Sequence, residues 1–257
     1  MASIQLDHVS LEFPIYDSSS RSFKNRVLGG NTGGRIGMAG GHASMVQALD
    51  GVTLHLRHGD RLGLVGHNGA GKTTLLRVIA GIYEPALGKV KIEGRVAPLF
   101  DISLGMDPEA SGYENIFLRG LFLGMTRKQV RERIDEIAAF TELGGFLDLP
   151  IRTYSAGMRM RLAFAVSTSI DPDILLLDEG IGAGDASFLE KAKARLEGFT
   201  NKAGIIVLAS HSGVLIRQIC RTAVVMERGR IVHLGETESV LKYYRDNVAS
   251  TARGAAG

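Results

Sequence analysis

Residues 61–73 read RLGLVGHNGAGKT, a short apolar run followed by the pattern G-x-x-x-x-G-K-T, which covers Gly66 to Thr73. The apolar run is typical of a strand buried on both faces, and the residues KTTLLRVIAG that follow predict a helix ending near Gly81. A glycine-rich loop between a strand and a helix lets backbone N–H groups surround phosphates, and the helix N-terminus favours their negative charge. The sequence therefore predicts a phosphate-binding loop.

Contacts with a nucleotide are predicted from the whole loop and the start of the helix. The residues concerned are Gly66, His67, Asn68, Gly69, Ala70, Gly71, Lys72, Thr73 and Thr74. Lys72 supplies a positive charge for the β- and γ-phosphates, and the hydroxyl group of Thr73 is a predicted Mg²⁺ ligand. The loop alone does not distinguish a kinase from a GTPase or a transport ATPase.

A second apolar run, Ile174 to Leu177, ends in Asp178 and Glu179. In open α/β sheets nucleotides bind at the carboxyl ends of the strands. We expect Asp178 to hold Mg²⁺ through water and Glu179 to act as the catalytic residue that orients or deprotonates the attacking water. The alternative is a strand that merely ends in solvated acids, and the phosphate-binding loop upstream argues against it.

His211 directly follows a third apolar run, Gly204 to Ser210, at the same kind of strand end. Its imidazole could there reach a γ-phosphate, which makes His211 a candidate catalytic residue. An isolated histidine at such a position usually has a structural role, so its significance depends on its place in a set of motifs.

The set is completed by the stretch YSAGM at 154–158, which opens a predicted apolar helix at Arg161 to Ile170. This stretch resembles the signature motif of ABC ATPases, usually written LSGGQ. The order of phosphate loop, signature, acidic strand end, Gly184-Asp185 and then His211 resembles the ABC ATPase family over about residues 3–235. On the basis of these motifs, the chain is identified as a member of that family.

The resemblance implies an α/β fold of the P-loop NTPase type. This fold has a RecA-like α/β core, an antiparallel β subdomain and a helical signature subdomain at about residues 110–170. It also implies ATP and Mg²⁺ as ligands, with Lys72, Glu179 and His211 as the catalytic residues.

The resemblance further implies a homodimer that encloses two ATP molecules between its subunits. Ser155, Ala156 and Gly157 of one copy are then expected to contact the nucleotide bound by the other copy. Asp185 is expected to help couple the two sites. A chain with one signature and one phosphate loop therefore needs a partner.

Three departures from the general family pattern resemble the ATPases that export O-antigen, capsule and teichoic-acid polymers. Met158 stands where glutamine is usual, and GIGAGDASFLEKA follows the catalytic carboxylate. The loop LFDISLGMDP at 99–108 has no glutamine, and Asp101 is the nearest replacement. Asp101 is either a metal ligand or a plain loop carboxylate, and the sequence leaves both possibilities open.

The predicted domain organisation is a single ABC ATPase domain at 1–248, with a surface insertion at 14–47 and a flexible tail at 249–257. No C-terminal carbohydrate-binding domain is expected. In polysaccharide exporters an extended N-terminal loop approaches the membrane subunit, so cations of the insertion such as Arg21 could meet phosphate head groups. A surface loop without such a role is the alternative.

An aromatic side chain is expected to stack on adenine just after the first strand. Phe13 and Tyr16 are the two candidates, and the sequence does not choose between them.

Other patterns predict individual elements. Residues 3–13 alternate as an edge strand with an irregularity near His8. Residues 126–143 predict an amphipathic helix whose capping box pairs Thr126 with Gln129. Residues 222–234 predict a hairpin that turns at Arg228-Gly229, and residues 236–248 predict a closing helix.

Composition excludes several classes of protein. The formal net charge is +3, but basic and acidic residues alternate along the chain, so no nucleic-acid partner is expected. The longest apolar stretches are far shorter than the roughly 20 residues of a transmembrane helix, and the N-terminus lacks a secretion signal. The single cysteine, Cys220, is expected to pack as a small buried side chain. We expect a peripheral protein at the cytoplasmic face of the inner membrane.

The predicted function is ATP hydrolysis that drives export of a lipid-linked polysaccharide through a separate membrane permease. A soluble ABC ATPase that acts on ribosomes or DNA is the main alternative. Such proteins generally carry two ATPase units, a long coiled coil or a zinc module, and this chain has none of these. A P-loop kinase or GTPase with an accidental signature match is a third possibility. The identity of the polymer stays open.

Overall fold

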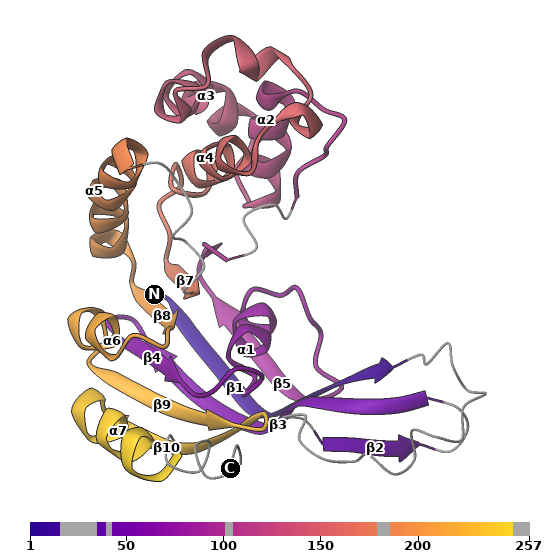
Figure 1. The fold of residues 1–257 in the computed structure, drawn as a ribbon, viewed down its shortest axis with the longest axis vertical. Helices are drawn as coiled ribbons and strands as arrows, with labels where there is room; N and C mark the ends of the chain where they lie inside the picture. The colour runs from indigo at the N-terminus through magenta and orange to yellow at the C-terminus, as the bar shows by residue number, and fades with distance from the viewer. Residues whose placement is uncertain (16–34, 40–42, 101–104, 179–185, 249–257) are drawn as a thin grey trace. The chain divides into compact units, whose positions relative to one another are not determined.

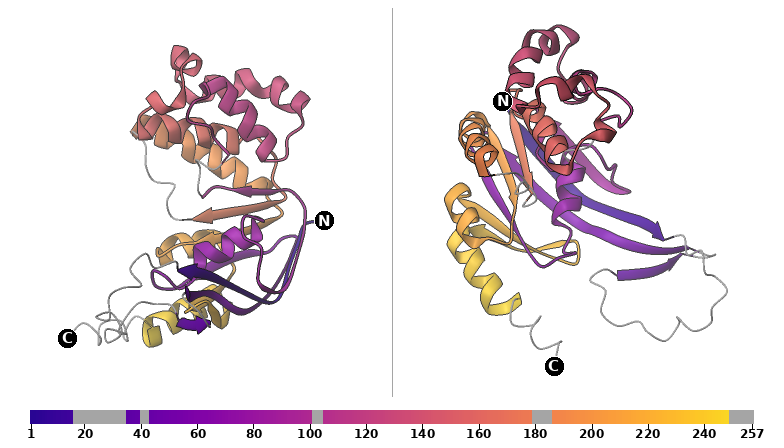
Figure 2. Two further views of the ribbon diagram at one scale, coloured as in Figure 1. Left: turned by 90° about the vertical axis from the view of Figure 1, so that its right-hand side faces the viewer. Right: turned by 45° about the horizontal axis from the view of Figure 1, so that its top comes forward.

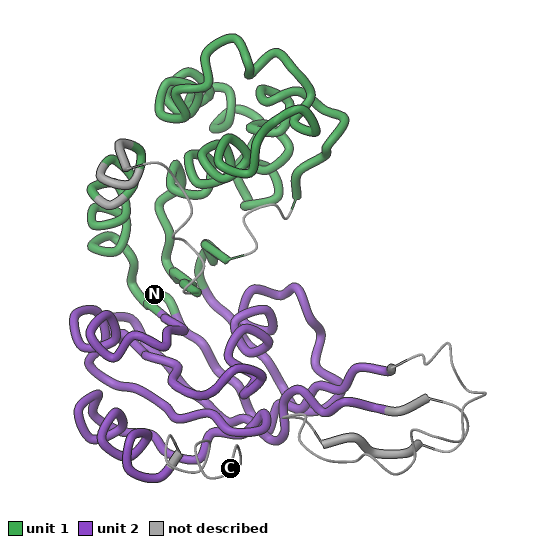
Figure 3. The backbone as a smooth tube through the Cα atoms, viewed as in Figure 1, with its two compact units in different colours: residues 1–2, 94–206 green, residues 3–93, 207–257 purple. Residues whose placement is uncertain are grey.

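The computed structural model describes residues 1–15, 35–39, 43–100, 105–178 and 186–248. The chain forms two compact units (Figure 3). Unit 1 comprises Met1–Ala2 and Gly94–Ile206, and unit 2 comprises Ser3–Glu93 and Val207–Gly257. The predicted tail at 249–257 lies outside the described residues.

Unit 2 contains a four-stranded antiparallel sheet in the order β2-β3-β1-β5. Its strands are β1 (Ser3–Ile15), β2 (Arg35–Ala39), β3 (Ala43–Arg57) and β5 (Leu87–Glu93) (Figure 1). The irregularity predicted in β1 is confirmed: His8 has a φ of 51°, and the register with β3 shifts between Leu6 and Val9. This bulge keeps Leu6 and Val9 both buried.

The strands extend further into the predicted insertion than the sequence indicates. β1 runs to Ile15 and β3 begins at Ala43, both within the stretch 14–47 that the sequence predicts as a surface insertion. β2 pairs with the start of β3, so that Gly37 lies opposite Met45. Pairing with neighbouring strands decides this region, because its glycine-rich composition has little strand propensity of its own.

A second sheet region of unit 2 follows the phosphate-loop strand. β4 (Arg61–Val65) pairs in parallel with β9 (Thr222–Glu227), which pairs antiparallel with β10 (Arg230–Glu236). The predicted hairpin is confirmed, since Arg228 and Gly229 have φ values of 47° and 80°. Two consecutive positive φ angles are typical of a type I′ turn. The helices of this region are α1 (Lys72–Ile79), α6 (Gly213–Ile219) and α7 (Thr237–Tyr243).

Unit 1 combines a short parallel strand pair with helices. β6 (Val96–Pro98) pairs with β7 (Ile174–Asp178), and β8 (Ile205–Ala209) begins in unit 1 and ends in unit 2. Figure 2 shows the helices from two further sides. They are α2 (Gly112–Phe122), α3 (Arg127–Thr141), α4 (Ala156–Ser167) and α5 (Ala186–Lys202), with short 3-10 segments at Gly144–Asp148 and Ile151–Thr153.

A buried arginine ties α2 to α4 in unit 1. Arg119 is 1% exposed and donates Nε–H and Nη2–H to the Ser167 hydroxyl oxygen, at 3.2 and 2.8 Å. Burial lowers the pKa of Arg119 to about 10, so the guanidinium stays protonated at neutral pH. The α4 helix is therefore held by a charge-assisted hydrogen bond as well as by apolar packing.

The single cysteine packs as predicted. Cys220 is buried at the end of α6, and desolvation raises the pKa of its thiol to about 12. The thiol therefore stays protonated and weakly reactive at neutral pH.

The predicted capping box of α3 is confirmed and provides a stability test. The Thr126 hydroxyl oxygen accepts from the Gln129 amide at 3.2 Å, and the Gln129 side chain accepts from the Thr126 amide at 2.8 Å. We expect Thr126→Ala to lower the free energy of unfolding by about 1 kcal/mol, because the first turn of α3 loses a hydrogen-bond partner. Urea denaturation of the two proteins checks this value, with Thr126→Ser as the control. Equal midpoints for Thr126→Ala and the unsubstituted chain would contradict it.

Candidate nucleotide-binding site

Two glycines shape the loop between β4 and α1. Gly66 has a φ of 158°, and a Cβ atom there would lie 2.4 Å from the carbonyl oxygen of Met226. Gly71 is the N-cap of α1 with a φ of 104°, and a Cβ atom there would lie 2.9 Å from the Ala48 carbonyl oxygen. Side chains at either position would displace neighbouring backbone. The strand-loop-helix order predicted from the sequence is confirmed.

The N-terminus of α1 is open to a ligand. Gly71 has no side chain with which to cap the first turn, and Asn68 and Gly69 are exposed. Backbone N–H groups at a helix N-terminus attract anions through hydrogen bonding and the helix dipole. The local geometry therefore fits a phosphate group.

Lys72 lies folded against the loop. Its side chain is buried, and Nζ donates to the carbonyl oxygens of Gly66 at 2.6 Å and His67 at 3.1 Å. The charge is thus held at the inner side of the loop by the two carbonyl groups. Thr73 and Thr74, in the first turn of α1, are partly exposed.

A backbone contact that the sequence did not reveal holds the loop in place. The Gly229 amide, in the turn between β9 and β10, donates to the Ala70 carbonyl oxygen at 3.0 Å. The Gly229 carbonyl oxygen in turn accepts from the Asp50 amide at 2.9 Å. A Cβ atom at Gly229 would lie 2.7 Å from the Ala48 carbonyl oxygen, which leaves room only for glycine. The sequence predicted the turn but carried no signal that it contacts the loop.

His211 lies in the same unit as the loop. The Ser210 amide donates to the Leu64 carbonyl oxygen at 3.4 Å, which places the end of β8 beside β4. His211, which comes next, is exposed. The structure thus brings the histidine-bearing strand end and the start of the phosphate loop to neighbouring strands.

The predicted carboxylates belong to unit 1. Asp178 ends β7 and is partly exposed, and β6 runs parallel beside it, with the Leu99 amide 2.8 Å from the Leu176 carbonyl oxygen. Four predicted site residues lie outside the described residues: Tyr16, Asp101, Glu179 and Asp185. Their roles stay predictions.

The signature stretch forms the start of α4 in unit 1. Ser155 is the N-cap of α4, and its hydroxyl oxygen accepts from the Met158 amide at 3.2 Å. Ser155 and Ala156 are exposed, and Gly157 has open space around it apart from the Ser155 hydroxyl. Tyr154 is buried just before them and donates its hydroxyl to the Phe146 carbonyl oxygen at 2.6 Å. The buried Tyr154 therefore fixes the start of the turn, and Ser155 and Ala156 stay accessible to solvent.

The candidate adenine-stacking residues are only partly described. Phe13 packs edge-on against Tyr83, with ring centroids 5.1 Å apart, and Tyr83 also lies beneath the Arg77 guanidinium. Tyr16 lies outside the described residues, so the choice between Phe13 and Tyr16 stays open. Tyr83 is an additional aromatic residue at this place, and no pattern in the sequence singles it out.

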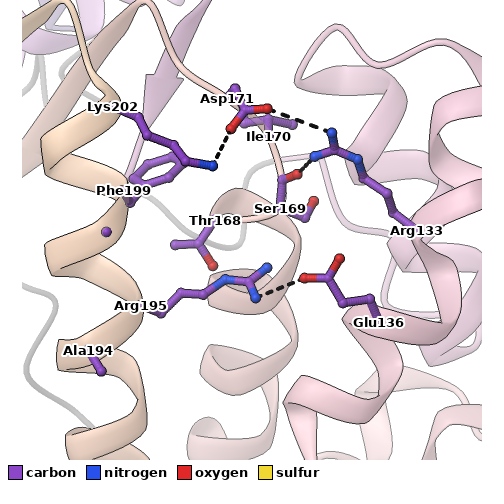
Figure 4. Close-up of a pocket in the computed structure, with 11 residues that line it drawn as sticks. Arg133, Glu136, Thr168, Ser169, Ile170, Asp171, Ala194, Arg195, Phe199 and Lys202 are labelled. Carbon is purple, nitrogen blue, oxygen red and sulfur yellow. Dashed lines mark hydrogen bonds and ion pairs between the residues drawn. The ribbon is translucent and has the colours of Figure 1, made fainter.

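A polar recess of about 510 Å³ lies elsewhere in unit 1 (Figure 4). Arg195 faces Glu136 at 2.9 Å, and Lys202 and Arg133 both face Asp171, at 2.9 and 3.7 Å. These cations thus meet carboxylates within the recess itself. The recess lies between α5 and other helices of unit 1. Neither the phosphate loop nor the signature lines it.

Both predicted ligands fit the donor groups that the structure describes. The open α1 N-terminus and the Lys72 charge suit a nucleotide phosphate, and the Thr73 hydroxyl and the Asp178 carboxylate are the hard oxygen donors that Mg²⁺ prefers. Among the described residues, no helix is long and apolar enough to cross a membrane.

Comparison with known proteins identifies the family. A family model described as ABC transporter matches residues 49–182. The chain belongs to the ABC transporter family, as the order of its motifs predicted.

Curated relatives include ATP-binding proteins of export systems. The chain is 48% identical over 231 residues to the O-antigen export system ATP-binding protein RfbE of Yersinia enterocolitica, covering 90% of this chain and 97% of that protein. It is 34% identical over 246 residues to the O-antigen export system ATP-binding protein RfbB of Klebsiella pneumoniae, covering 96% and 98%. It is 38% identical over 198 residues to the teichoic acids export ATP-binding protein TagH of Bacillus cereus, covering 77% and 36%.

Solved structures confirm the predicted fold class. The chain resembles a dimeric ATP-binding cassette, MJ0796, bound to ADP and Pi in a post-hydrolysis state. The TM-score is 0.65 at 19% identity, over 91% of this chain and 98% of that one. It also resembles an ATP-binding subunit of an ABC transporter, with a TM-score of 0.66 at 18% identity over 94% and 93%.

The contact between Gly229 and the phosphate loop yields a prediction. Gly229→Ala strains the turn and pushes the loop, so we expect nucleotide affinity to fall about tenfold. Titration with a fluorescent ADP analogue measures the change. Gly124→Ala is the matched control, because Gly124 has a φ of 81° but no atom within 4 Å of the point that a Cβ atom would occupy. Equal losses of affinity in the two variants would contradict the role of the turn.

Proposed function

We propose that this chain is the ATP-binding and ATP-hydrolysing subunit of an ABC exporter that moves a lipid-linked polysaccharide through a separate membrane permease. The observation that carries this proposal is the open, glycine-shaped loop at the start of α1, with Lys72 buried beneath it, in a chain that also presents an exposed Ser155-Gly157 turn. The close relatives that serve O-antigen export support the choice of cargo class.

In unit 2, the loop binds the phosphates of ATP. The amides of the α1 N-terminus and the Lys72 ammonium group offset the negative charge of the β- and γ-phosphates. When bound, Mg²⁺ would be held by Thr73 and, through water, by Asp178, and it would offset the negative charge of the phosphates. The Lys72 ammonium leaves its present carbonyl partners, at least in part, to reach a phosphate oxygen.

Glu179 orients the attacking water and accepts its proton, and His211 contacts the γ-phosphate from the end of β8. The carboxylate of Asp178 lies in the strand that leads directly to Glu179. These roles follow from the family motifs at these positions.

The signature completes the site of a second copy. Ser155, Ala156 and Gly157 are exposed or partly exposed at the N-terminus of α4, where the hydroxyl and the backbone amides are available to a partner's γ-phosphate. ATP binding therefore closes a homodimer, and hydrolysis and product release reopen it. Asp185 couples the two sites.

The closing and opening of this dimer drive two permease subunits, which carry the polysaccharide across the membrane. The ATPase itself is peripheral, at the cytoplasmic face of the inner membrane. The cations of the 14–47 insertion, such as Arg21, are suited to meet the phosphates of the lipid-linked substrate or of the membrane surface.

Two substitutions test the ATPase cycle. Lys72→Ala removes the cation beneath the loop, and we expect ATP turnover to fall by at least about a hundredfold. Glu179→Gln leaves binding intact and removes the group that activates water, so we expect a stable dimer in the presence of ATP and Mg²⁺. Steady-state turnover and light scattering measure the two effects. A Glu179→Gln protein that stays monomeric with saturating ATP and Mg²⁺ argues against the shared-site dimer.

Purification of the chain from native membranes tests the transport role. We expect a polytopic membrane permease to copurify with it, and loss of the chain to leave lipid-linked polymer inside the cell. Recovery of ribosomes or nucleic acid in place of a permease would favour the soluble ABC ATPase alternative.

A further inference from the structure

Two functionally different segments of the chain meet within unit 1. α4 begins at the exposed signature turn, and α5 follows directly on residues 179–185, which contain Glu179 and Asp185. In the proposed dimer, one segment serves the partner's nucleotide and the other serves the chain's own. The contacts between α4 and α5 therefore join the signature helix to the helix that follows these residues in the sequence.

An aromatic cluster anchors the first turn of α5. Phe188 is fully buried and packs against Phe140 of α3 and Phe164 of α4, with ring centroids 5.8 and 6.0 Å apart. Phe140 and Phe164 also stack on each other at 6.1 Å. The three rings thus join three helices at the end of α5 that adjoins residue 185.

Arg161 links this cluster to the signature helix. Its guanidinium carbon lies 4.8 Å from the centroid of the Phe188 ring, and its Nη1 lies 3.5 Å from Oε2 of Glu142. The side chain is only 16% exposed. A planar guanidinium can present its face to a ring and its edge to a carboxylate at the same time, and its rigid fork holds both partners in one geometry.

Glu142 receives cations from both helices. Lys191 of α5 donates from Nζ to Oε1 of Glu142 at 2.8 Å and also to the Phe140 carbonyl oxygen at 3.2 Å. The hydrogen bond from Lys191, its charge, and the charge of Arg161 hold the pKa of the Glu142 carboxyl below its usual range. This carboxylate is therefore a shared anchor for α4 and α5.

The backbone at Glu142 is unusual in a way that fits this role. Glu142 ends α3 with φ 58° and ψ 26°, a left-handed conformation that non-glycine residues rarely adopt. Such conformations persist where surrounding contacts fix them, and they gather at functional sites. Here the conformation accompanies a carboxylate that meets both Arg161 and Lys191.

We propose that Arg161 is a positioning residue for ATP turnover, which fixes the start of α5 against the signature helix by stacking on Phe188 and pairing with Glu142. The inference rests on the proposed function, because it assigns Arg161 to the same catalytic cycle. A misplacement of a catalytic group by about 1 Å is enough to reduce turnover by roughly a hundredfold. Arg161 thus acts on kcat through the placement of the signature helix, while the phosphate loop in unit 2 keeps its affinity.

The far end of α5 supplies a matched control. Lys202 pairs with Asp171 at 2.9 Å, and both side chains are more than half exposed. This pair also joins α5 to the rest of unit 1, but it lies at the end of the helix remote from residue 185. Lys202→Met removes an ion pair of α5 without touching the aromatic cluster.

The experiment compares Arg161→Met, Arg161→Lys and Lys202→Met in the full chain. Three quantities are measured: kcat and KM for ATP, affinity for a fluorescent ADP analogue, and the thermal midpoint. We expect both Arg161 variants to lose at least about tenfold in kcat with ADP affinity nearly unchanged, and Lys202→Met to keep the turnover of the unsubstituted chain. Arg161→Lys retains the charge but not the planar guanidinium, so its loss of turnover measures the need for the guanidinium geometry between Phe188 and Glu142.

Three results would overturn the proposal. One is unchanged kcat in the Arg161 variants, and another is full turnover in Arg161→Lys. The third is a loss of kcat that merely follows a lowered thermal midpoint or weakened ADP binding, which indicates a structural role. If Arg161→Met does not fold, Arg161→Lys and Glu142→Gln decide the question by the same measurements. Failure of the proposed function is distinct, because the unsubstituted chain would then show no ATP turnover.

Discussion

The structure depends on a backbone hydrogen bond between two segments far apart in the chain, the Gly229 amide and the Ala70 carbonyl group. A phosphate loop binds through its main chain, so its conformation has to be set before the ligand arrives. Gly66 and Gly71 allow the backbone of the loop to approach Met226 and Ala48 closely, and the turn at Gly229 then holds it from the other side. Lys72 lies buried against two carbonyl oxygens of this loop.

The two units contribute different motifs to the proposed ATPase. Unit 2 provides the phosphate loop and His211, whereas unit 1 provides Asp178 and the signature turn. The proposed roles of these parts follow from the family motifs, and the local geometry fits them. The loop is open at the N-terminus of α1, and the Ser155 turn is exposed above the buried Tyr154. The proposed dimer with shared sites would explain why a single chain presents both surfaces.

Charged side chains in unit 1 are concentrated where α5 meets the helical layer. Single exposed ion pairs contribute little to stability, so the number of such pairs says less than their placement. Near Lys202, at the C-terminal end of α5, ion pairs line a polar recess. Near Phe188, at the N-terminal end of α5, ion pairs lie beside three packed phenylalanine rings. The second end adjoins the segment with Glu179 and Asp185, and there Arg161 and Lys191 share the carboxylate of Glu142. The proposed positioning role of Arg161 belongs to this end.

The sequence by itself determined the elements whose signals are local. The phosphate loop, the capping box at Thr126, the turn at Arg228-Gly229 and the bulge near His8 all depend on a few adjacent residues, and the structure contains each of them. Only the tertiary structure decided features that join distant segments. Among these are the strand pairing of β2 with β3, the contact of Gly229 with Ala70, the burial of Arg119 against Ser167, and the meeting of Arg161 with Glu142. Periodicity and propensity describe how a segment folds, but they carry no information on which distant backbone groups will pair with it.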